Sequence, residues 1–405
     1  MSQEQDRTPK MEIPVVRLRP KANAKAVRHG FPWIYANELV TDRRTKSLPA
    51  GTIAHLEDHA RHSLGLVALT PQSKIIARML DRDSAAQIDR AWLGHKIHKA
   101  LEMRQRLFAD PFYRLIHAEA DSLPGVIVDR FDDVLVLQPN AAWAERHLDD
   151  ICAALIEGTG ARTILKNAGG RTRSLEGLDD QSGVLHGAAP TAPVPVPMNG
   201  AIYMADLVAG QKTGLFFDQR PNHAFAAQLA RGARVLDVFS HVGGFALASL
   251  VGGAAHALAV DGSAPALALA EQGAVASGVG DSLATRRGDA FDVLTALKTE
   301  GAEFDLVICD PPAFAPSRSA LDAGLRAYER VARLAAALVA EGGYLGLCSC
   351  SHAVDVQAFR AASVRGIGRA GRHARLIHTG FAGPDHPVLP QLAESGYLKS
   401  LFFRL

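Results

Sequence analysis

Four acidic residues and one cysteine stand at the ends of short strand-like runs in the C-terminal half of the chain. The acids are Asp237, Asp261, Asp289 and Asp310, and the cysteine is Cys350. In a parallel sheet, ligands bind beyond the carboxyl ends of the strands. A lone acid after a strand is more often a helix cap, so the prediction rests on the whole series. The series predicts one ligand site that collects all five side chains.

The segment around the first acid, residues 237–244, is rich in glycine and reads Asp-Val-Phe-Ser-His-Val-Gly-Gly. It lacks the GxGxxG spacing of dinucleotide sites, and the absence of a P-loop lysine argues against ATP. Asp261 is placed to bind ribose hydroxyls, and Asp289 to accept a hydrogen bond from an adenine amino group. Together these segments resemble the S-adenosylmethionine fold of class I methyltransferases. The expected cofactor contacts in them are Asp237, Phe239, Ser240, Gly243, Asp261, Gly262, Ser263, Asp289, Ala290 and Asp310.

The fourth acid opens the sequence Asp-Pro-Pro-Ala-Phe, residues 310–314. This pattern is typical of methyltransferases that act on planar nitrogens or bases. The rigid Pro311 and Pro312 fix the backbone carbonyls, and Phe314 offers a stacking face for an extruded base. We expect these three residues on the substrate side. The structural alternative is a simple turn after a buried strand.

Cysteines 348 and 350 end a later strand-like run, Cys-Ser-Cys-Ser-His. Residues i and i+2 share a face of a strand, so both face one side and Cys350 lies nearer the rim of the site. Methylation of cytosine at C5 needs a thiolate that adds to C6, because C5 alone is a poor nucleophile. We expect Cys350 to be this nucleophile and Asp310 to assist near N3. Cys348 and Cys309 are expected to be buried strand residues, and the run lacks the spaced ligands of a metal site.

Strand and helix patterns alternate regularly from about residue 233. This alternation predicts an α/β domain with a parallel, doubly wound sheet. The expected strands are 235–239, 257–261, 304–310 and 344–350, and the expected helices are 244–251, 264–277 and 319–340.

Two smaller domains are expected before this one. Residues 13–85 contain short β-runs bounded by Gly and Pro, which favour a small barrel or sandwich. The next stretch mixes a helical pattern over 87–108, strand-like runs and a helix near 141–157, which predicts an α+β domain. The proline-rich stretch 188–197 predicts a connector or an edge strand. We therefore expect domains at 1–88, 89–190 and 191–405.

Composition excludes several classes of protein. The chain has 405 residues, 48% hydrophobic and 21% charged, which indicates packed cores in two or three domains. No apolar run approaches the roughly 18–20 residues that cross a bilayer, so no membrane partner is expected. The N-terminus lacks the apolar stretch of a signal peptide. Four cysteines are too few for a disulfide framework, so we expect a cytoplasmic protein.

The formal net charge of +2 hides an uneven distribution. Residues 1–90 hold 15 Lys and Arg against 10 Asp and Glu, residues 91–190 hold 11 against 14, and residues 191–405 hold 18 against 18. A basic patch attracts polyanions by counterion release, although a solvated face is the alternative. We expect modest, local RNA binding at the N-terminal cluster of Arg17, Arg19, Lys21, Lys25 and Arg28.

These motifs resemble the cytosine-5 methyltransferases of bacterial large-subunit ribosomal RNA that carry an N-terminal PUA domain. The resemblance runs nearly end to end, through residues 29–35, 119–130, 210–220, 237–245, 310–314, 349–351, 386–390 and 397–399. The departures are two residues inserted after His29, Asp237, the His241-Val242 pair, and Ala313 where the family has lysine. The resemblance implies a Rossmann-like class I methyltransferase domain, S-adenosyl-L-methionine as cofactor and ribosomal RNA as partner. It also makes Gln219 and Arg220 candidate cofactor contacts.

Three other functions stay open. Residues 310–314 would also suit methylation of a base nitrogen, with Cys350 merely structural. A second alternative is an RNA-binding assembly factor with a decayed active site. The argument against it is that three acids of the site are intact, Asp261, Asp289 and Asp310. A small-molecule methyltransferase with an unrelated N-terminal module is the third. The oligomeric state stays open, with a homodimer as one candidate.

Overall fold

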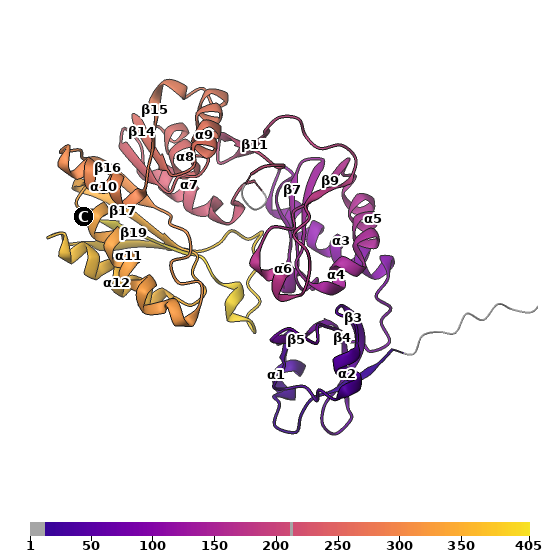
Figure 1. Ribbon diagram of the computed structural model, residues 1–405. Coiled ribbons are helices and arrows are strands. Elements are labelled where there is room, and N and C mark those ends of the chain that lie inside the picture. Colours follow the sequence, from indigo (N-terminus) through magenta and orange to yellow (C-terminus); the bar gives the residue numbers. More distant parts are fainter. Residues whose placement is uncertain (1–12, 211–213) are drawn as a thin grey trace, which may run out of the picture.

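The computed structural model describes residues 13–210 and 214–405, which form three parts (Figure 1). The N-terminal part lies below the central part in this view, and the C-terminal part lies to the left of the central part. None of the described helices is long and apolar enough to span a bilayer.

The N-terminal part is a small β domain, as predicted. Its sheet has the strand order β1-β3-β4-β5-β2. Apolar side chains from its strands, among them Ile34, Leu56 and Val67, pack into one core. The elements are β1 (Val15–Arg17), α1 (Ala24–Arg28), β2 (Trp33–Tyr35), α2 (Arg43–Ser47), β3 (Thr52–Glu57), β4 (Ser63–Leu69) and β5 (Ile75–Asp81).

The central part is the predicted α+β domain, with the sheet order β10-β9-β8-β7-β6. The single helix expected over 141–157 is in fact two helices that meet at His147. The elements are α3 (Arg90–Leu107), β6 (Phe112–His117), β7 (Val126–Phe131), β8 (Val134–Pro139), α4 (Ala142–Arg146), α5 (Leu148–Thr159), β9 (Thr163–Lys166), α6 (Arg171–Leu175) and β10 (Gly183–His186).

A two-stranded hairpin follows, formed by β11 (Val194–Met198) and β12 (Ala201–Ala205). Pro195 and Pro197 are tolerated in β11 because this strand pairs with a single neighbour. Residues 194–197 of the proline-rich stretch thus belong to a strand with one neighbour, and residues 188–193 connect it to the central part; the sequence predicted a connector or an edge.

The C-terminal part has a seven-stranded sheet in the order β15-β14-β13-β16-β17-β19-β18. The first five strands are parallel, and β19 pairs antiparallel with both β17 and β18. Its strands are β13 (Arg234–Val238), β14 (His256–Asp261), β15 (Leu283–Arg287), β16 (Phe304–Cys309), β17 (Val339–Ser349), β18 (Arg375–Gly380) and β19 (Lys399–Arg404). Its helices are α7 (Arg220–Leu229), α8 (Gly244–Val251), α9 (Ala264–Ala276), α10 (Ala290–Thr299), α11 (Leu321–Ala336) and α12 (Val356–Arg369).

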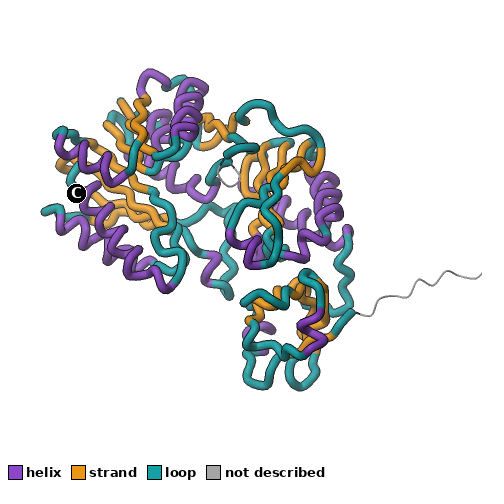
Figure 2. The backbone as a smooth tube through the Cα atoms, viewed as in Figure 1, coloured by secondary structure: helices purple, strands orange, loops and turns teal. Residues whose placement is uncertain are grey.

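Helices cover both faces of this sheet (Figure 2). Val331 of α11 and Phe359 of α12 pack into one core, together with residues of α10. Ala226 of α7, Phe245 of α8 and Leu267 of α9 belong to the core on the opposite face. The arrangement confirms the expected Rossmann-like domain.

Two boundaries in this domain differ from the sequence prediction by more than two residues. The helix expected to reach residue 340 ends at Ala336, and the strand expected from residue 344 begins at Val339. The reason is that apolar residues after the helix already pair with β16, across an irregularity in the ladder. The strand ends at Ser349, so Cys350 is the first residue beyond it.

Candidate functional site

The strand order brings the predicted residues to one edge of the sheet. Strands β15, β14, β13, β16 and β17 are neighbours in that order. Val238 of β13 pairs with Val260 on one side and Cys309 on the other. Asp261 and Asp310 therefore lie at the same level on either side of Phe239. The predicted convergence of strand ends is observed.

The loop after β13 is held in an unusual backbone conformation. Phe239, His241 and Gly243 have positive φ angles of 64°, 51° and 78°. Such angles are uncommon for residues other than glycine and mark places where the surroundings hold the backbone. Asp261 supplies part of this hold, because its Oδ2 accepts a hydrogen bond from the His241 amide at 2.9 Å.

Asp237 and Ser240 bring buried polar atoms to the same loop. The Oδ2 of Asp237 accepts a hydrogen bond from the Ala246 amide at 2.8 Å, and burial raises the pKa of this carboxyl to about 7. Its Oδ1 and the hydroxyl of Ser240 are buried without a hydrogen-bond partner among the described residues. Buried polar atoms normally find partners, so these two atoms fit contact with a polar ligand.

The next two strand ends begin helices. Ser263 caps α9 through a hydrogen bond from the Ala266 amide at 3.3 Å. Asp289 caps α10 by accepting from the Phe291 and Asp292 amides at 2.9 and 3.3 Å. Capping accounts for the acid at 289 without a ligand, so its contact with adenine stays a prediction, as do contacts of the neighbouring Gly262 and Ala290.

Gln219 lies beside the fourth acid. Its Nε2 donates to Asp310 Oδ2 at 2.8 Å, and its Oε1 accepts from Asn222 Nδ2 at 2.7 Å. All three side chains are therefore oriented by one chain of hydrogen bonds. Asn222 was missed from the sequence, where its only signal is a polar residue one helical turn after Gln219.

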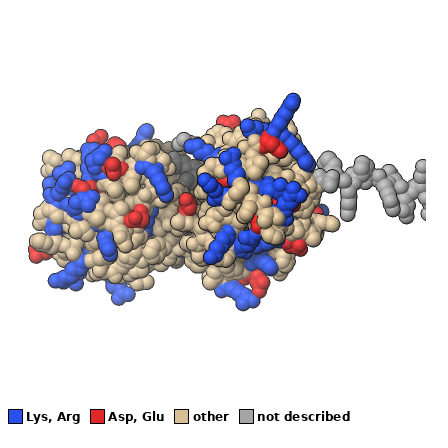
Figure 3. Space-filling view, turned by 90° about the horizontal axis from the view of Figure 1, so that it is seen from below, with Lys and Arg blue, Asp and Glu red and all other residues tan. Residues whose placement is uncertain are grey.

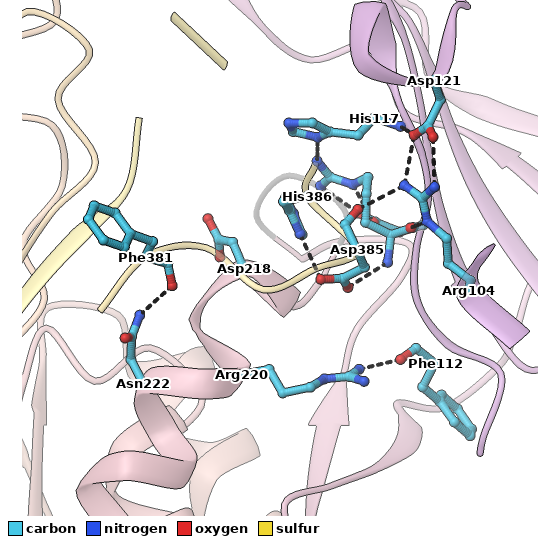
Figure 4. A network of polar contacts seen from close by, with 12 residues as sticks. Arg104, Phe112, His117, Asp121, Asp218, Arg220, Asn222, Phe381, Asp385 and His386 are labelled. Atoms are coloured by element: carbon cyan, nitrogen blue, oxygen red, sulfur yellow. Dashed lines mark hydrogen bonds and ion pairs between the residues drawn. The ribbon is translucent and has the colours of Figure 1, made fainter. Parts of the chain in front are cut away.

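Arg220 does not join this group. Its guanidinium donates to the Phe112 carbonyl of the central domain, as Figure 4 shows. It also lies over the rings of Phe108 and Phe217, with distances of 4.4 and 5.4 Å to the ring centroids. The structure thus brings only Gln219 of the predicted pair to the strand ends. The reason is that Arg220 begins α7 and faces the domain boundary.

The three cysteines of the C-terminal domain differ in exposure: two lie in strands and Cys350 follows one. Cys309 and Cys348 are buried, and burial raises the pKa of both thiols. Because the thiolate is the reactive form, both are poor nucleophiles. Cys350 is partly exposed. Cys309 pairs with Leu347, so Cys350 lies two residues beyond the level of Asp310 on the adjacent strand.

Lys399 lies beside Cys350 and was missed from the sequence. Its side chain is buried, and its Nζ donates to the carbonyl oxygens of Ser351 at 2.6 Å and Tyr397 at 2.8 Å. No carboxylate of the described residues forms an ion pair with it. Burial lowers the pKa of Lys399 to about 8, although the nearby Cys350 and Asp355 act to raise it. The only sequence signal was a lysine at the start of an apolar strand.

The serines on either side of Cys350 fix the loop from β16. Ser351 Oγ accepts from the Ala315 amide at 3.0 Å and bonds the Tyr328 hydroxyl at 2.7 Å. Ser349 Oγ donates to the same hydroxyl at 2.9 Å. The two predicted substrate-side segments are therefore joined directly.

Phe314 is already surrounded by aromatic rings. Its centroid lies 5.0 Å from that of Tyr328, 6.2 Å from Phe291 and 6.3 Å from Phe239. This packing gives the ring a structural role, and stacking against a base stays a prediction. Pro311 is buried and Pro312 exposed.

Comparisons with known proteins agree with this geometry. Residues 16–82 match the PUA-like domain family, and residues 179–404 match the S-adenosylmethionine-dependent methyltransferase family. Ribosomal RNA large subunit methyltransferase I of Shewanella frigidimarina is 32% identical over 394 residues, which cover 96% of this chain and 99% of that protein. The protein of the same name from Aliivibrio fischeri is 33% identical, over 95% of this chain and 98% of its own. The chain belongs to the ribosomal RNA large subunit methyltransferase I family.

Solved structures show the same fold for this methyltransferase. A protein from Streptococcus mutans, assigned as a SAM-dependent methyltransferase, is 20% identical and matches with a TM-score of 0.82 over 97% of this chain and 100% of its own. A methyltransferase structure complexed with SAH has a TM-score of 0.83, also at 20% identity over 97% of this chain and 100% of its own.

The segment before β19 ties the methyltransferase domain to the central domain (Figure 4). Asp385 accepts from the Arg114 amide at 3.1 Å through Oδ2, and its carbonyl accepts from Arg104 at 2.9 Å. Tyr397 donates its hydroxyl proton to Asp218 Oδ2 at 2.6 Å, next to Gln219. Residues 211–213 of the motif that leads to Gln219 lie outside the described part of the chain.

The N-terminal basic cluster of the methyltransferase is partly neutralised. Arg17 pairs with Glu57 at 2.8 Å, Arg28 pairs with Asp58, and Arg19 donates to the Leu39 carbonyl at 2.9 Å. Lys21 and Lys25 are exposed. The structure thus engages three of the five predicted RNA contacts within the domain. Across residues 13–210 and 214–405, no three His, Cys, Asp or Glu side chains form a group that could hold a metal ion.

Proposed function

We propose that this protein transfers the methyl group of S-adenosyl-L-methionine to C5 of a cytosine in large-subunit ribosomal RNA. The names of its full-length relatives support ribosomal RNA as the substrate. One arrangement of residues supports methylation at C5 through a cysteine adduct. The partly exposed Cys350 follows β17 beside the Asp310 strand end, and the buried ammonium of Lys399 binds the next peptide carbonyl.

The residues at the strand ends suit the cofactor. When bound, S-adenosylmethionine supplies an electrophilic methyl group on a sulfonium. We assign the first contacts to the loop after β13, where Asp237 Oδ1 and Ser240 Oγ still need polar partners and Phe239 and Gly243 shape the backbone. The remaining proposed contacts are Asp261, Gly262, Ser263, Asp289, Ala290 and Asp310.

In the proposed reaction, the Cys350 thiolate forms a bond to C6 of the cytosine. The electron pair of the C5–C6 double bond is then available at C5 to take the methyl group. Asp310, oriented by Gln219, holds the N3 edge of the base. The transfer releases S-adenosylhomocysteine as the leaving group. Water then takes the C5 proton, and the electron pair of that C–H bond restores the C5–C6 double bond and expels the Cys350 thiolate. A positive charge near the sulfur favours the thiolate, and Lys399 is placed to provide it.

Substitution of the proposed nucleophile tests this chemistry. Cys350→Ala should abolish transfer of labelled methyl to ribosomal RNA while cofactor binding by calorimetry persists. Cys152→Ala is the matched control, because Cys152 is partly exposed but lies in the central domain. Full activity of Cys350→Ala would overturn the mechanism.

A second function is methylation of a base nitrogen, favoured by the Asp-Pro-Pro-Ala-Phe sequence and the oriented Asp310 carboxylate. That reaction needs no thiol adduct. Mass analysis of the methylated nucleoside, with bisulfite sequencing of ribosomal RNA with and without the gene, separates the two. An assembly factor without catalysis would bind no cofactor, and a small-molecule enzyme would keep its activity without residues 1–85.

A further inference from the structure

A groove between α11 and α12 is lined entirely by charged side chains. Its volume is about 520 Å³, and its lining residues are Arg326, Glu329, Arg330, Arg333 and Arg369. We propose that this groove binds the phosphate backbone of the substrate RNA. The inference rests on the proposed RNA substrate and adds a second contact surface, outside the N-terminal domain and the catalytic edge.

Three of these arginines form a stripe on one helix. Arg326, Arg330 and Arg333 occupy positions i, i+4 and i+7 of α11, so they share a face. All three are exposed, and none forms an ion pair with a carboxylate of the described residues. The guanidinium of Arg330 lies 4.4 Å from the ring centroid of Phe291, which holds it in place. The stripe therefore presents positive charge that no carboxylate of the described residues neutralises.

The one acid in the groove is already neutralised. Glu329 is mostly buried and pairs with Arg365 at 3.0 Å and with Arg369, both from α12. The groove lining thus contains four arginines and a single glutamate, and that glutamate is paired with Arg365 and Arg369. The other acids on these helices, Asp322 of α11 and the N-cap Asp355 of α12, lie at the ends nearer the catalytic edge.

The chemistry of the lining favours a polyphosphate over a protein partner. Guanidinium groups bind phosphate oxygens through paired N–H donors. Protein interfaces depend instead on buried aromatic or aliphatic anchors, and no lining residue of this groove is apolar. Consecutive phosphates of an RNA strand match a row of arginines along a helix.

The location suits an RNA that also reaches the catalytic edge. α11 starts at Leu321, seven residues after Phe314, and runs back along the sheet from that edge. Figure 3, seen from below, shows Lys and Arg side chains over both the methyltransferase domain at the left and the part at the right that contains the N-terminal domain. An RNA that spans the two parts on this side would meet basic side chains on each of them.

Charge-removing variants of the full-length protein test the groove. The test variant is Arg326→Gln, Arg330→Gln and Arg333→Gln together. The matched control is Lys99→Gln, Arg106→Gln and Arg231→Gln, which removes the same charge from exposed positions elsewhere. Binding to a transcript of large-subunit ribosomal RNA is measured between 50 and 200 mM salt, a range over which phosphate contacts change affinity strongly (about 10³–10⁵-fold for six to ten contacts).

We expect the test variant to bind this RNA about tenfold or more weakly, and its salt slope to fall by about 2 to 3. Its KM for RNA should rise while its affinity for S-adenosylmethionine stays unchanged. Equal behaviour of the test and control variants would overturn the proposal. If the triple variant unfolds, Arg326→Gln with Arg333→Gln keeps the Arg330–Phe291 contact and gives the same test. A wild-type protein that methylates no ribosomal RNA would instead contradict the proposed function.

Discussion

Lys399 Nζ lies 2.6 Å from the carbonyl oxygen of Ser351, the residue that follows Cys350. The hydrogen bond joins the first residue of β19 to the turn after β17, whose strands are already paired through Ser349 and Lys399. A buried ammonium is therefore fixed beside the proposed nucleophile. Its role would be to position the turn and to stabilise the thiolate.

Lys399→Met should slow methyl transfer about 10- to 100-fold, because it removes the charge that favours the thiolate. Alkylation of Cys350, followed by mass spectrometry, should slow in parallel. Cys152, whose pKa burial raises to about 11, is the internal control in the same sample. Lys399→Arg keeps the charge and should restore part of the rate. If Cys350 were alkylated at the same rate in Lys399→Met as in the wild type, the lysine would not stabilise the thiolate and its role would be structural.

The pH dependence of the reaction should report the same lysine. The pKa of Lys399 is lowered from 10.5 to about 8, so the folded chain loses this charge from about pH 8 upward. The rate should fall there, and Lys399→Arg should move the fall to higher pH. Between pH 8 and 10.5 the unfolded chain binds more protons at Lys399 than the folded chain does. The free energy of unfolding contributed by Lys399 therefore rises with pH over this range. A thermal scan at each pH therefore separates loss of activity from unfolding.

Asp237→Asn should stabilise the protein at high pH. Burial raises the pKa of Asp237 from 3.8 to about 7, so the folded chain holds this proton more tightly than the unfolded chain. The free energy of unfolding therefore falls as the pH rises through this window. The gain at pH 8 would be at most about 4 kcal/mol and should shrink toward pH 4. Guanidinium unfolding at both pH values measures it. Asp261→Asn is the contrast and should destabilise, because both oxygens of Asp261 accept backbone hydrogen bonds.

Gln219→Ala should slow methyl transfer about tenfold by leaving the Asp310 carboxylate unoriented. Gln219→Glu should be slower still, since it places a second carboxylate against Asp310. Single-turnover transfer with saturating RNA measures the rate, and calorimetry checks cofactor affinity. Equal rates for wild type and Gln219→Ala would mean that Asp310 needs no such support.

Local sequence pattern was enough for the parallel part of the fold. The apolar runs that end at Asp261 and Asp310 are strands, and their shared edge follows from the parallel arrangement. The separation of buried Cys348 from partly exposed Cys350 was also predictable, because the second stands at the end of its run.

Long-range pairing was not predictable from these patterns. Lys399 binds the carbonyl that follows Cys350 only because β19 inserts beside β17, and no local periodicity encodes that neighbour. The direction of Arg220 depends on the aromatic rings of another domain. The arginine stripe of α11 was hidden because residues 191–405 hold equal numbers of basic and acidic residues.

The position of β19 between β17 and β18 limits the order in which the sheet can form. Both neighbours precede β19 in the sequence, so during translation the sheet stays open between them until Lys399–Arg404 has been made. Until then Cys350 has no buried ammonium beside it. The proposed site around Cys350 is therefore complete only after β19 has paired with both of its neighbours.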